Sequence, residues 1–305
     1  MNPTHARRHG PAGAASSAEP AGQPGTLILA AAPIGRTDDS SSRLATALEQ
    51  APVIAAEDTR RLRRLAAALG VTPAGRVVSY YEDVEVARGP ALLAALAAGE
   101  DVLLVTDAGM PGISDPGYRL VTAAIAAGVA VTVLPGPSAV TAAVAVSGLP
   151  TDRFCFEGFP PRRAGERARR FASLRDERRT LVFFESPRRL AGTLAELAVA
   201  LGADRRAVVC RELTKTHEEI RRGTLAELAD WAGRGVLGEI TLVVGGAPAP
   251  AGTASADDAA AEVGMLEQAG TPRKEAIAQT ATRLGLPKRE VYDAVIRARS
   301  RPAWP

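Results

Sequence analysis

Side chains that could transfer protons follow several of the apolar runs in this sequence. Candidate acids and bases at these positions are Asp58, Glu82, Asp107, Glu185, Glu212 and Lys215. A carboxylate or a neutral amine in such a place can accept a proton from an attacking hydroxyl group. Lysine can lose its proton when it is desolvated and arginine cannot, so Lys215 is notable in a chain with only three lysines. Each acid alone also fits a helix cap or a surface ion pair, and Lys215 also fits an exposed structural lysine.

Three loops rich in small residues could hold a ligand. They are Pro33-Ile34-Gly35, Asp107-Ala108-Gly109 and the turn from Pro135 to Ser138. Small residues let a ligand approach backbone N–H and C=O groups directly. The glycine spacing matches neither a dinucleotide-binding fingerprint nor a phosphate-binding loop, which argues against NAD and ATP. The loops therefore favour a ligand that carries adenine or an amino acid, although any one of them could be an ordinary tight turn.

No residue pattern predicts a metal site or a covalent nucleophile. His5 and His9 lie in the N-terminal tail, and Cys155 and Cys210 are far apart, so no Cys/His cluster has metal-ligand spacing. No Gly-x-Ser-x-Gly elbow is present either. The chemistry would then rest on a bound small cofactor and on the positioning of the reactants.

An apolar run and the loop after it organise the first half of the chain. Residues Val102 to Val105 predict a buried strand, and a Gly/Pro/Asp loop extends from there to Tyr118. Within this loop, Ser114-Asp115-Pro116 predicts a cap followed by proline at the first helical position. Ligands of open α/β sheets bind outside the carboxyl ends of strands, which is where this loop would lie.

Five predicted strands alternate with helices in the first half of the sequence. The strands span residues 26–32, 52–56, 76–79, 102–105 and 130–134. This alternation predicts a parallel, right-handed α/β domain over residues 25–148.

The pattern changes after residue 148. Strands at residues 153–157, 180–184, 207–211, 217–223 and 239–244 predict a mixed or antiparallel sheet. We therefore expect a second α/β domain over residues 149–246, an Ala/Pro/Gly-rich linker at 247–256 and a basic module of three short helices over 257–305. Residues 1–24 are rich in Ala, Gly, Pro and Ser, which predicts a disordered tail.

The charge distribution predicts an anionic, extended partner. The net charge is only +3, but basic residues outnumber acids in the segments 162–179 and 271–301. Such zones suit a nucleic acid, although a solvated helix face or an arginine-rich coding bias would give the same composition. No apolar segment is long enough to cross a bilayer, and there are only two cysteines, so we expect a soluble cytoplasmic protein.

Several blocks of the sequence resemble one family of enzymes. The blocks are Ala32-Pro33-Ile34-Gly35, Glu57-Asp58-Thr59-Arg60, Thr106-Asp107-Ala108-Gly109-Met110-Pro111, Leu134-Pro135-Gly136-Pro137-Ser138, Phe184-Glu185-Ser186-Pro187 and Glu212-Leu213-Thr214-Lys215. They are similar to the ribosomal RNA small subunit methyltransferase I family of the tetrapyrrole-methylase-like superfamily. The similarity covers the sequence from Gly25 to Gly246, and the Glu-Asp-Thr-Arg and Glu-Leu-Thr-Lys blocks are its most specific parts.

The resemblance implies a two-domain class III methyltransferase with S-adenosylmethionine in the cleft between its α/β domains. It also implies a homodimer and a ribose 2′-hydroxyl substrate on a decoding-centre cytidine of 16S rRNA in the small ribosomal subunit. Family cofactor contacts would fall on Pro33, Gly35, Asp107, Ala108, Gly109, Ser114, Asp115, Ser138 and Ala139, and on Phe184 and Leu213 of the second domain. The chain departs from the family pattern at Ala32 and Arg36, and Tyr80-Tyr81 stands where the family has a histidine-bearing segment.

The catalytic base and the RNA contacts are further expectations. Our candidates for a base that assists proton removal are Lys215, Asp58 and Glu185, in that order. The RNA backbone would contact the terminal helices and Arg60, Arg162, Arg163, Arg167, Arg170 and Arg188, so binding should weaken as salt rises. Two alternatives remain open: another methyltransferase of the superfamily, acting on a porphyrin precursor or a protein, and a non-catalytic RNA-binding or ribosome-assembly factor.

Overall fold

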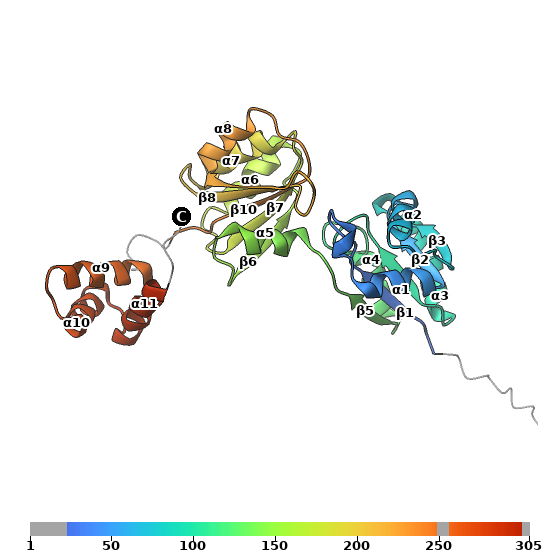
Figure 1. Cartoon of the computed structure of the whole chain (residues 1–305), viewed down its shortest axis with the longest axis horizontal. Coiled ribbons are helices and arrows are strands. Elements are labelled where there is room, and N and C mark those ends of the chain that lie inside the picture. Colours follow the sequence, from blue (N-terminus) through green and yellow to red (C-terminus); the bar gives the residue numbers. More distant parts are fainter. Residues whose placement is uncertain (1–22, 249–255, 301–305) are drawn as a thin grey trace, which may run out of the picture. The chain divides into compact units, whose positions relative to one another are not determined.

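The computed structural model describes residues 23–248 and 256–300, which form two compact units (Figure 1). The first unit comprises the described residues up to Ala142 together with the segment Glu212–Glu218, which we call the return segment. The second unit comprises Ala143–Arg211 and the described residues from Glu219 onward. Residues 1–22 of the predicted tail and 249–255 of the predicted linker lie outside the described residues. Lys215, on the return segment, therefore belongs with the first unit.

A five-stranded parallel sheet forms the middle of the first unit. Its strands are β1 (Thr26–Ala30), β2 (Val53–Ala56), β3 (Arg76–Ser79), β4 (Val102–Val105) and β5 (Ala130–Leu134). They lie in the spatial order β3-β2-β4-β1-β5, and every neighbouring pair is parallel. The predicted parallel α/β architecture is confirmed, with β4 at the centre of the sheet.

Helices cover both faces of this sheet because successive strand residues point to opposite sides. Leu103 of β4 shares a core with α1 and α2, whereas Leu104 shares a core with α3 and α4. Both leucines are fully buried, and replacing either by alanine would cost about 2–5 kcal/mol. The strand is thus anchored from two sides, which fixes the position of its carboxyl end. The helices and short 3-10 turns of this part of the chain are Thr37–Asp39, α1 (Ser42–Gln50), α2 (Thr59–Ala68), Glu82–Val84, α3 (Glu85–Ala97), α4 (Tyr118–Ala126) and α5 (Ala139–Ser147).

The helix that follows β4 begins later than predicted. Pro116 does not open the helix; Gly117, with φ 136°, precedes its first residue. A Cβ at position 117 would lie 2.9 Å from Leu104 Cδ2, so glycine is required where the loop passes over β4. The Gly117 N–H donates to Glu85 Oε1 at 2.7 Å. A buried carboxylate of α3 therefore satisfies this helix end, and the predicted Ser114-Asp115 cap is wrong.

The second unit contains a mixed five-stranded sheet in the order β6-β7-β10-β8-β9. Its strands are β6 (Phe154–Gly158), β7 (Thr180–Glu185), β8 (Arg206–Arg211), β9 (Glu219–Thr224) and β10 (Ile240–Val244). The β6–β7 pair is parallel and the other pairs are antiparallel, which confirms the predicted mixed sheet. Helices on one side of this sheet share one apolar core with it (Figure 1). They are α6 (Ala164–Ser173), α7 (Leu190–Leu201) and α8 (Leu225–Ala232).

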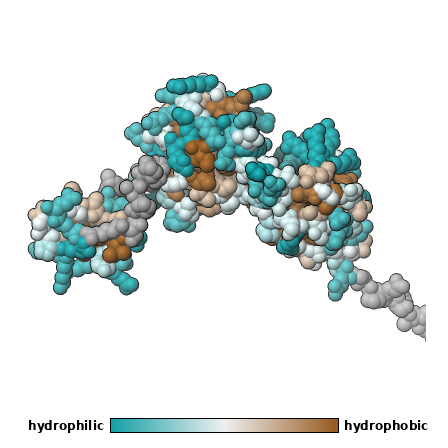
Figure 2. All heavy atoms as spheres, in the orientation of Figure 1, coloured by the Kyte–Doolittle hydropathy of each residue, from teal (hydrophilic) through white to brown (hydrophobic). Residues whose placement is uncertain are grey.

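Three helices near the C-terminus form a small bundle with its own apolar core, as predicted. They are α9 (Ala256–Gln268), α10 (Arg273–Leu284) and α11 (Lys288–Ser300). Val263, Ile277 and Val291 come from the three helices and pack together. Figure 2 shows hydrophilic and hydrophobic residues side by side on the visible face of this bundle. Across residues 23–248 and 256–300, none of the helices is long and apolar enough to cross a membrane.

Candidate cofactor and catalytic site

The loops after β1 and β4 meet at the carboxyl edge of the first sheet. The Ala32 N–H donates to the Gly109 carbonyl at 2.8 Å, and the Gly109 N–H donates to the Ala32 carbonyl at 2.9 Å. Gly109 has φ 68°, in the left-handed region that glycine adopts without strain. The structure thus brings together two of the predicted ligand loops, residues 33–35 and 107–109.

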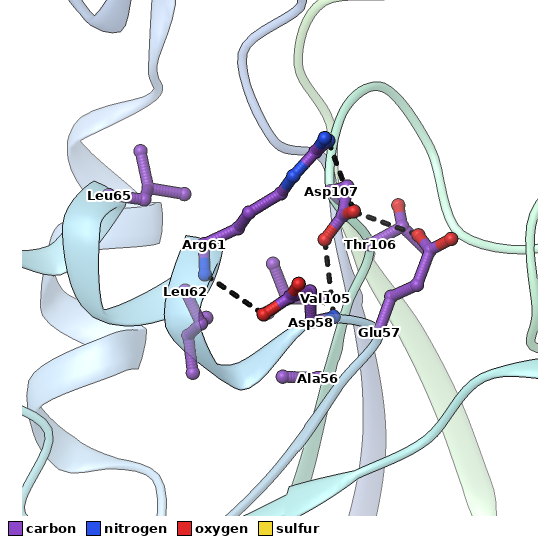
Figure 3. Close-up of a pocket in the computed structure, with 9 residues that line it drawn as sticks. All are labelled: Ala56, Glu57, Asp58, Arg61, Leu62, Leu65, Val105, Thr106 and Asp107. Carbon is purple, nitrogen blue, oxygen red and sulfur yellow. Dashed lines mark hydrogen bonds and ion pairs between the residues drawn. The ribbon is translucent and has the colours of Figure 1, made fainter.

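The loop after β2 joins the same edge through carboxylates (Figure 3). The Asp107 N–H donates to Glu57 Oε2 at 3.0 Å, and the Asp58 N–H donates to Asp107 Oδ1 at 3.2 Å. The Arg61 guanidinium of α2 lies 3.1 Å from Asp107 Oδ2. These side chains line a small pocket together with Ala56, Leu62, Leu65, Val105 and Thr106. The ends of β2 and β4 are therefore joined by a polar network with a hollow beside it.

Three carboxyl groups at this edge hold protons more strongly than usual. Burial raises the pKa of Glu57 and the pKa of Asp107. Burial, together with the charges of Glu57 and Asp107, raises the pKa of Asp115 to about 7. We call these three residues the carboxylate cluster. Because its members disfavour one another's negative charge, the cluster favours a positively charged ligand group nearby.

Unusual backbone conformations mark two loops of the first unit. In the part of the chain that the structure describes, the non-glycine residues with positive φ are Ser114 at 69°, Glu212 at 52° and Thr214 at 65°. Each such conformation costs on the order of 1–3 kcal/mol, and such residues concentrate at ligand-binding and active sites. Ser114 follows β4, and the other two belong to the return segment. Both loops are therefore candidates for ligand contact.

The return segment lies against the loop that follows β1. The Arg36 N–H donates to Thr214 Oγ1 at 3.3 Å. A Cβ at Gly35 would lie 2.4 Å from Thr214 Oγ1 and 2.6 Å from Lys215 Cγ, so glycine permits this approach. Lys215 is partly buried, and its Nζ lies 3.0 Å from Glu212 Oε1. The structure thus places Lys215 directly beside a predicted cofactor loop.

Asp58 caps α2 and is poorly suited to the predicted role of base. Its carboxylate accepts from the N–H groups of Arg60 and Arg61 at 2.7 and 3.3 Å. Hydrogen bonds from Arg60 lower the pKa of Asp58 to about 2. A carboxylate with so low a pKa is a weak proton acceptor near neutral pH. The geometry therefore favours helix capping for Asp58, and its role as a base stays a prediction.

Glu185 is buried in the second unit and joins β7 to α7. Its Oε1 accepts from the Ser186 N–H at 2.7 Å, and its Oε2 accepts from the Thr193 hydroxyl at 2.5 Å. The Arg189 guanidinium lies 3.5 Å from Oε2. A carboxylate with these three partners and 2% residue exposure is well bonded within the second unit. This environment favours a structural role for Glu185, and its catalytic role stays a prediction.

The remaining predicted cofactor residues are distributed over both units. Pro33, Ala108 and the Ser114-Asp115 pair lie in loops at the carboxyl edge of the first sheet. Ser138 and Ala139 follow β5 at the start of α5, and Leu213 is buried in the return segment. Phe184 belongs to β7 of the second unit, where its ring packs against Phe156 and Phe159.

The predicted RNA-binding arginines divide into paired and exposed residues. Arg60, Arg163, Arg167 and Arg170 form ion pairs with Asp58, Glu166, Glu196 and Glu157, respectively. Arg167 is the most enclosed of them, because its guanidinium also donates to the carbonyls of Pro161 and Arg162. Its contacts indicate a structural role. Arg162 and Arg188 are exposed and stay candidates for phosphate contact.

Two residues of the site, Arg61 and Glu85, are not among those that the sequence predicts. Arg61 follows the Asp58 cap by three residues, and this spacing on a helix could have indicated that it reaches back to the neighbouring loop. Glu85 gives no such signal, because an acid in the first turn of a helix ordinarily faces solvent. Its burial depends on two partners that are distant in sequence. They are the Gly117 N–H and the Arg119 side chain, whose Nε lies 3.5 Å from Glu85 Oε2.

Known proteins share this sequence pattern and this fold. The sequence pattern of the family described as Tetrapyrrole (Corrin/Porphyrin) Methylases matches residues 26–229. Ribosomal RNA small subunit methyltransferase I of Mycobacterium tuberculosis (strain CDC 1551 / Oshkosh) is 54% identical over 282 residues, which cover 92% of this chain and 98% of that protein. The chain belongs to the ribosomal RNA small subunit methyltransferase I family, within the tetrapyrrole methylases.

Further members show how widely this family and fold extend. Ribosomal RNA small subunit methyltransferase I of Pseudomonas aeruginosa is 42% identical over 89% of this chain and 97% of its own length. The crystal structure of uroporphyrin-III-C-methyltransferase from Thermus thermophilus has a TM-score of 0.53 at 23% identity, covering 72% of this chain and 94% of that one. At this level of identity, the similarity to this solved structure shows a shared fold and nothing about function.

The site of this methyltransferase I family member fits S-adenosylmethionine. Membership of a methylase family supports this cofactor, as the sequence predicts. Gly35 and Gly109 permit the close approach of the loops that would surround the cofactor, and the carboxylate cluster suits the cationic centres of the cofactor. Among the described residues, no group of three or more His, Cys, Asp or Glu side chains could hold a metal ion.

Proposed function

We propose that this chain transfers a methyl group from S-adenosylmethionine to the rRNA of the small ribosomal subunit. The observation that carries this proposal is 54% identity, over 92% of the chain, to a protein named for that substrate. More finely, we propose the 2′-hydroxyl of a decoding-centre cytidine in 16S rRNA as the acceptor. Exposed Arg162 and Arg188 support a polyanionic substrate.

The loops of the first unit would hold the cofactor. When bound, S-adenosylmethionine supplies a methyl group on a positively charged sulfur, from which it is readily displaced. Backbone groups of residues 33–35, 107–109 and 138–139 would bind the uncharged parts of the cofactor, and the carboxylate cluster would attract its positive charge. Because strained residues such as Ser114 and Thr214 are already fixed in place, little ordering of these loops would be needed on binding.

Lys215 is our proposed residue for proton transfer from the ribose hydroxyl. It lies on the return segment against Gly35, next to the proposed cofactor site. In its neutral form it would accept the hydroxyl proton, and in its charged form it would orient the oxygen by donating a hydrogen bond. Alignment of the hydroxyl with the methyl group would supply much of the acceleration. Asp58 and Glu185 are less suited, because their carboxylates are engaged by α2 and by α7.

Two alternative functions are a methyltransferase that acts on a different substrate and a protein without catalytic activity. A porphyrin precursor or a protein side chain is compatible with the fold, but exposed arginines and the excess of basic residues over acids on α10 and α11 favour RNA. A non-catalytic RNA-binding or ribosome-assembly factor would have no use for the cofactor loops. Isothermal titration with S-adenosylmethionine separates this class, since a lack of binding would favour it.

The decisive experiment is methyl transfer from labelled cofactor to isolated small subunits, to naked 16S rRNA and to a porphyrin precursor. Nuclease digestion and chromatography of the labelled RNA then identify the modified nucleoside. We expect 2′-O-methylcytidine from at least one RNA substrate and no label in the porphyrin. A labelled base would contradict the ribose as acceptor, and label in neither RNA would contradict rRNA methylation altogether.

We also propose that the chain acts as a homodimer, which the family resemblance implies. Sedimentation equilibrium of the full chain at several concentrations tests this directly. A mass of one chain, 31.6 kDa, at concentrations where the enzyme is fully active would rule it out.

A further inference from the structure

Three phenylalanine rings gather at one edge of the second unit. The Phe156 and Phe184 rings lie 4.9 Å apart in an edge-to-face arrangement, and the Phe159 and Phe184 rings lie 5.6 Å apart. We call these residues the phenylalanine cluster. Phe159 is 56% exposed, and the other two are partly exposed. Single exposed apolar residues are common on protein surfaces, but rings that gather in one partly exposed patch mark an interaction site more often.

The loop that carries Phe159 is held rigidly. Arg189 donates to the carbonyls of Pro160 and Pro161 at 2.8 and 3.1 Å. Arg167 donates to the Pro161 carbonyl at 3.3 Å and is itself fixed by an ion pair with Glu196 of α7. Two guanidinium groups thus clamp the backbone directly after Phe159. A ring that is exposed and yet fixed in place loses little entropy when a flat partner stacks on it.

Positive charge flanks the cluster on the same loops. Arg162 follows the clamped prolines, and Arg188 precedes the clamping Arg189. Both side chains are exposed, and no ion pair links either of them to any residue in the ranges that the structure describes. They contrast with Arg167 and Arg170, which are paired with acids. The cluster therefore combines an exposed aromatic face with charges that remain available to an anion.

We propose that the phenylalanine cluster is a stacking platform for an unstacked base of the RNA substrate, with Phe159 in direct contact. Arg162 and Arg188 contact the phosphates on either side of that base. Single-stranded nucleic acids are bound in this way, by aromatic faces that stack on bases and cations that follow the backbone. This inference rests on the proposed rRNA methyltransferase function and names the part of the second unit that selects a single-stranded or splayed-out nucleotide.

Two other occupants fit the observations less well. The adenine of S-adenosylmethionine would also stack on a phenylalanine ring, but that cofactor carries no phosphate to engage Arg162 and Arg188. A second copy of the chain would bury both arginines, at a cost unless acids faced them. An RNA strand accounts for the rings and the charges together.

The test compares Phe159→Leu with Phe154→Leu as a matched control. Phe154 lies on β6 and is 39% exposed, and it belongs to no ring pair in the described part of the chain. We expect Phe159→Leu to weaken binding of a fluorescent small-subunit rRNA fragment about 5- to 100-fold, the range for loss of one stacked base. Its KM for RNA should rise similarly, with kcat and the dissociation constant of S-adenosylmethionine changed less than about twofold. Phe159→Tyr should restore binding and Phe154→Leu should leave it unchanged, while thermal melting confirms that each variant is folded.

The charge component has its own measurement. In the Arg162→Gln/Arg188→Gln double variant, the slope of log affinity against log salt should become shallower by about 1 to 1.5, as expected for two lost phosphate contacts on a single strand. Arg76→Gln serves as the control, because Arg76 is exposed, is already paired with Glu100 and is not among the predicted RNA contacts.

Each outcome bears on the platform. If Phe159→Leu binds RNA as tightly as the wild type and both methylate normally, the stacking-platform proposal is wrong and the proposed function is unaffected. A parallel loss of cofactor affinity assigns the ring to the cofactor, and a change of oligomeric state assigns it to a subunit interface; either result overturns the platform. A wild-type chain that neither binds nor methylates RNA overturns the platform together with the proposed function.

Discussion

Carboxylates at the strand ends of the two sheets are built in opposite ways. Glu185 at the end of β7 is buried with an arginine, a hydroxyl and a backbone N–H as partners. At the ends of β2 and β4, Glu57 and Asp107 lie close together with Asp115, and burial raises the pKa of all three. A fully bonded carboxylate fixes the fold, whereas carboxylates that are only partly compensated are suited to a ligand.

The arginines show the same division within one unit. Arg167 joins α6 to α7 through Glu196, and its guanidinium is largely enclosed. Arg162 and Arg188 are exposed, and they follow Phe159 and Phe184 of the phenylalanine cluster by three and four residues in sequence. Residue type alone therefore does not tell a structural arginine or carboxylate from a candidate functional one in this chain. We use the number of partners of each side chain to distinguish them. The predictions below test that distinction from the largest expected effect to the smallest.

Replacing Lys215 with alanine should have the largest effect on activity. If Lys215 transfers or orients the ribose proton, kcat should fall by about 100-fold or more. The dissociation constant of S-adenosylmethionine, measured by isothermal titration, should change by less than about threefold, since the loop at Gly35 keeps its backbone groups. Arg76→Ala, which removes an exposed cation at the start of β3 outside the predicted site, is the control. Normal methylation by Lys215→Ala would remove this residue from the mechanism.

Replacing Glu185 with alanine should act on stability and leave catalysis alone. The change leaves Arg189 and Thr193 without their carboxylate partner, and breaking a buried pair from one side costs about 3 kcal/mol or more. Chemical denaturation of the second unit, followed by tryptophan fluorescence of Trp231, should show this loss. The fraction that remains folded should methylate at the wild-type rate per molecule. A folded variant with a collapsed kcat would return Glu185 to the candidate bases.

Replacing Asp115 with asparagine should change the pH dependence of stability. The pKa of Asp115 is about 7 in the folded chain and about 3.9 when unfolded, so the protonated carboxyl favours folding. That contribution is complete below pH 4 and is lost as the pH rises through 7. The variant should therefore be more stable than the wild type at pH 8, by about 1–2 kcal/mol after allowance for solvent screening. The difference should vanish near pH 4; a difference independent of pH in thermal melts would show that Asp115 does not titrate in this range.

The architecture is predictable because it depends on patterns that are local in sequence. The apolar run Val102–Val105 and its counterparts alternate with helices, and this period alone leads to a parallel sheet whose strand ends share an edge. The positions of the ligand loops follow from the same argument. The Glu-Leu-Thr-Lys block likewise marks Lys215 by residue type alone, because lysine is rare in this chain.

The features that the sequence does not predict depend on contacts between distant segments. Nothing near Gly117 indicates that Leu104 forbids a Cβ there or that Glu85 caps the helix from α3. The roles of Asp58 and Glu185 depend on whether a carboxylate is already bonded, and that depends on the partners that folding brings to it. The sequence therefore locates the candidate acids and bases, whereas the folded contacts divide them into structural and functional groups.

Replacing Asp58 with alanine should have the smallest effect, although Asp58 lines the pocket at the carboxyl edge. The change removes the hydrogen bonds to the Arg60 and Arg61 N–H groups and thus one helix cap. The melting temperature should fall by about 2–4 °C, the range for loss of one cap in a unit of this size. Methylation should fall by less than about fivefold, because a carboxylate with a pKa of about 2 contributes little as a proton acceptor. Asp58→Asn keeps the capping oxygen and should restore the melting temperature. A loss of kcat comparable to that of Lys215→Ala in both variants would instead show that a bonded, helix-capping carboxylate can take part in the chemistry, and the distinction drawn between the two kinds of carboxylate would fail.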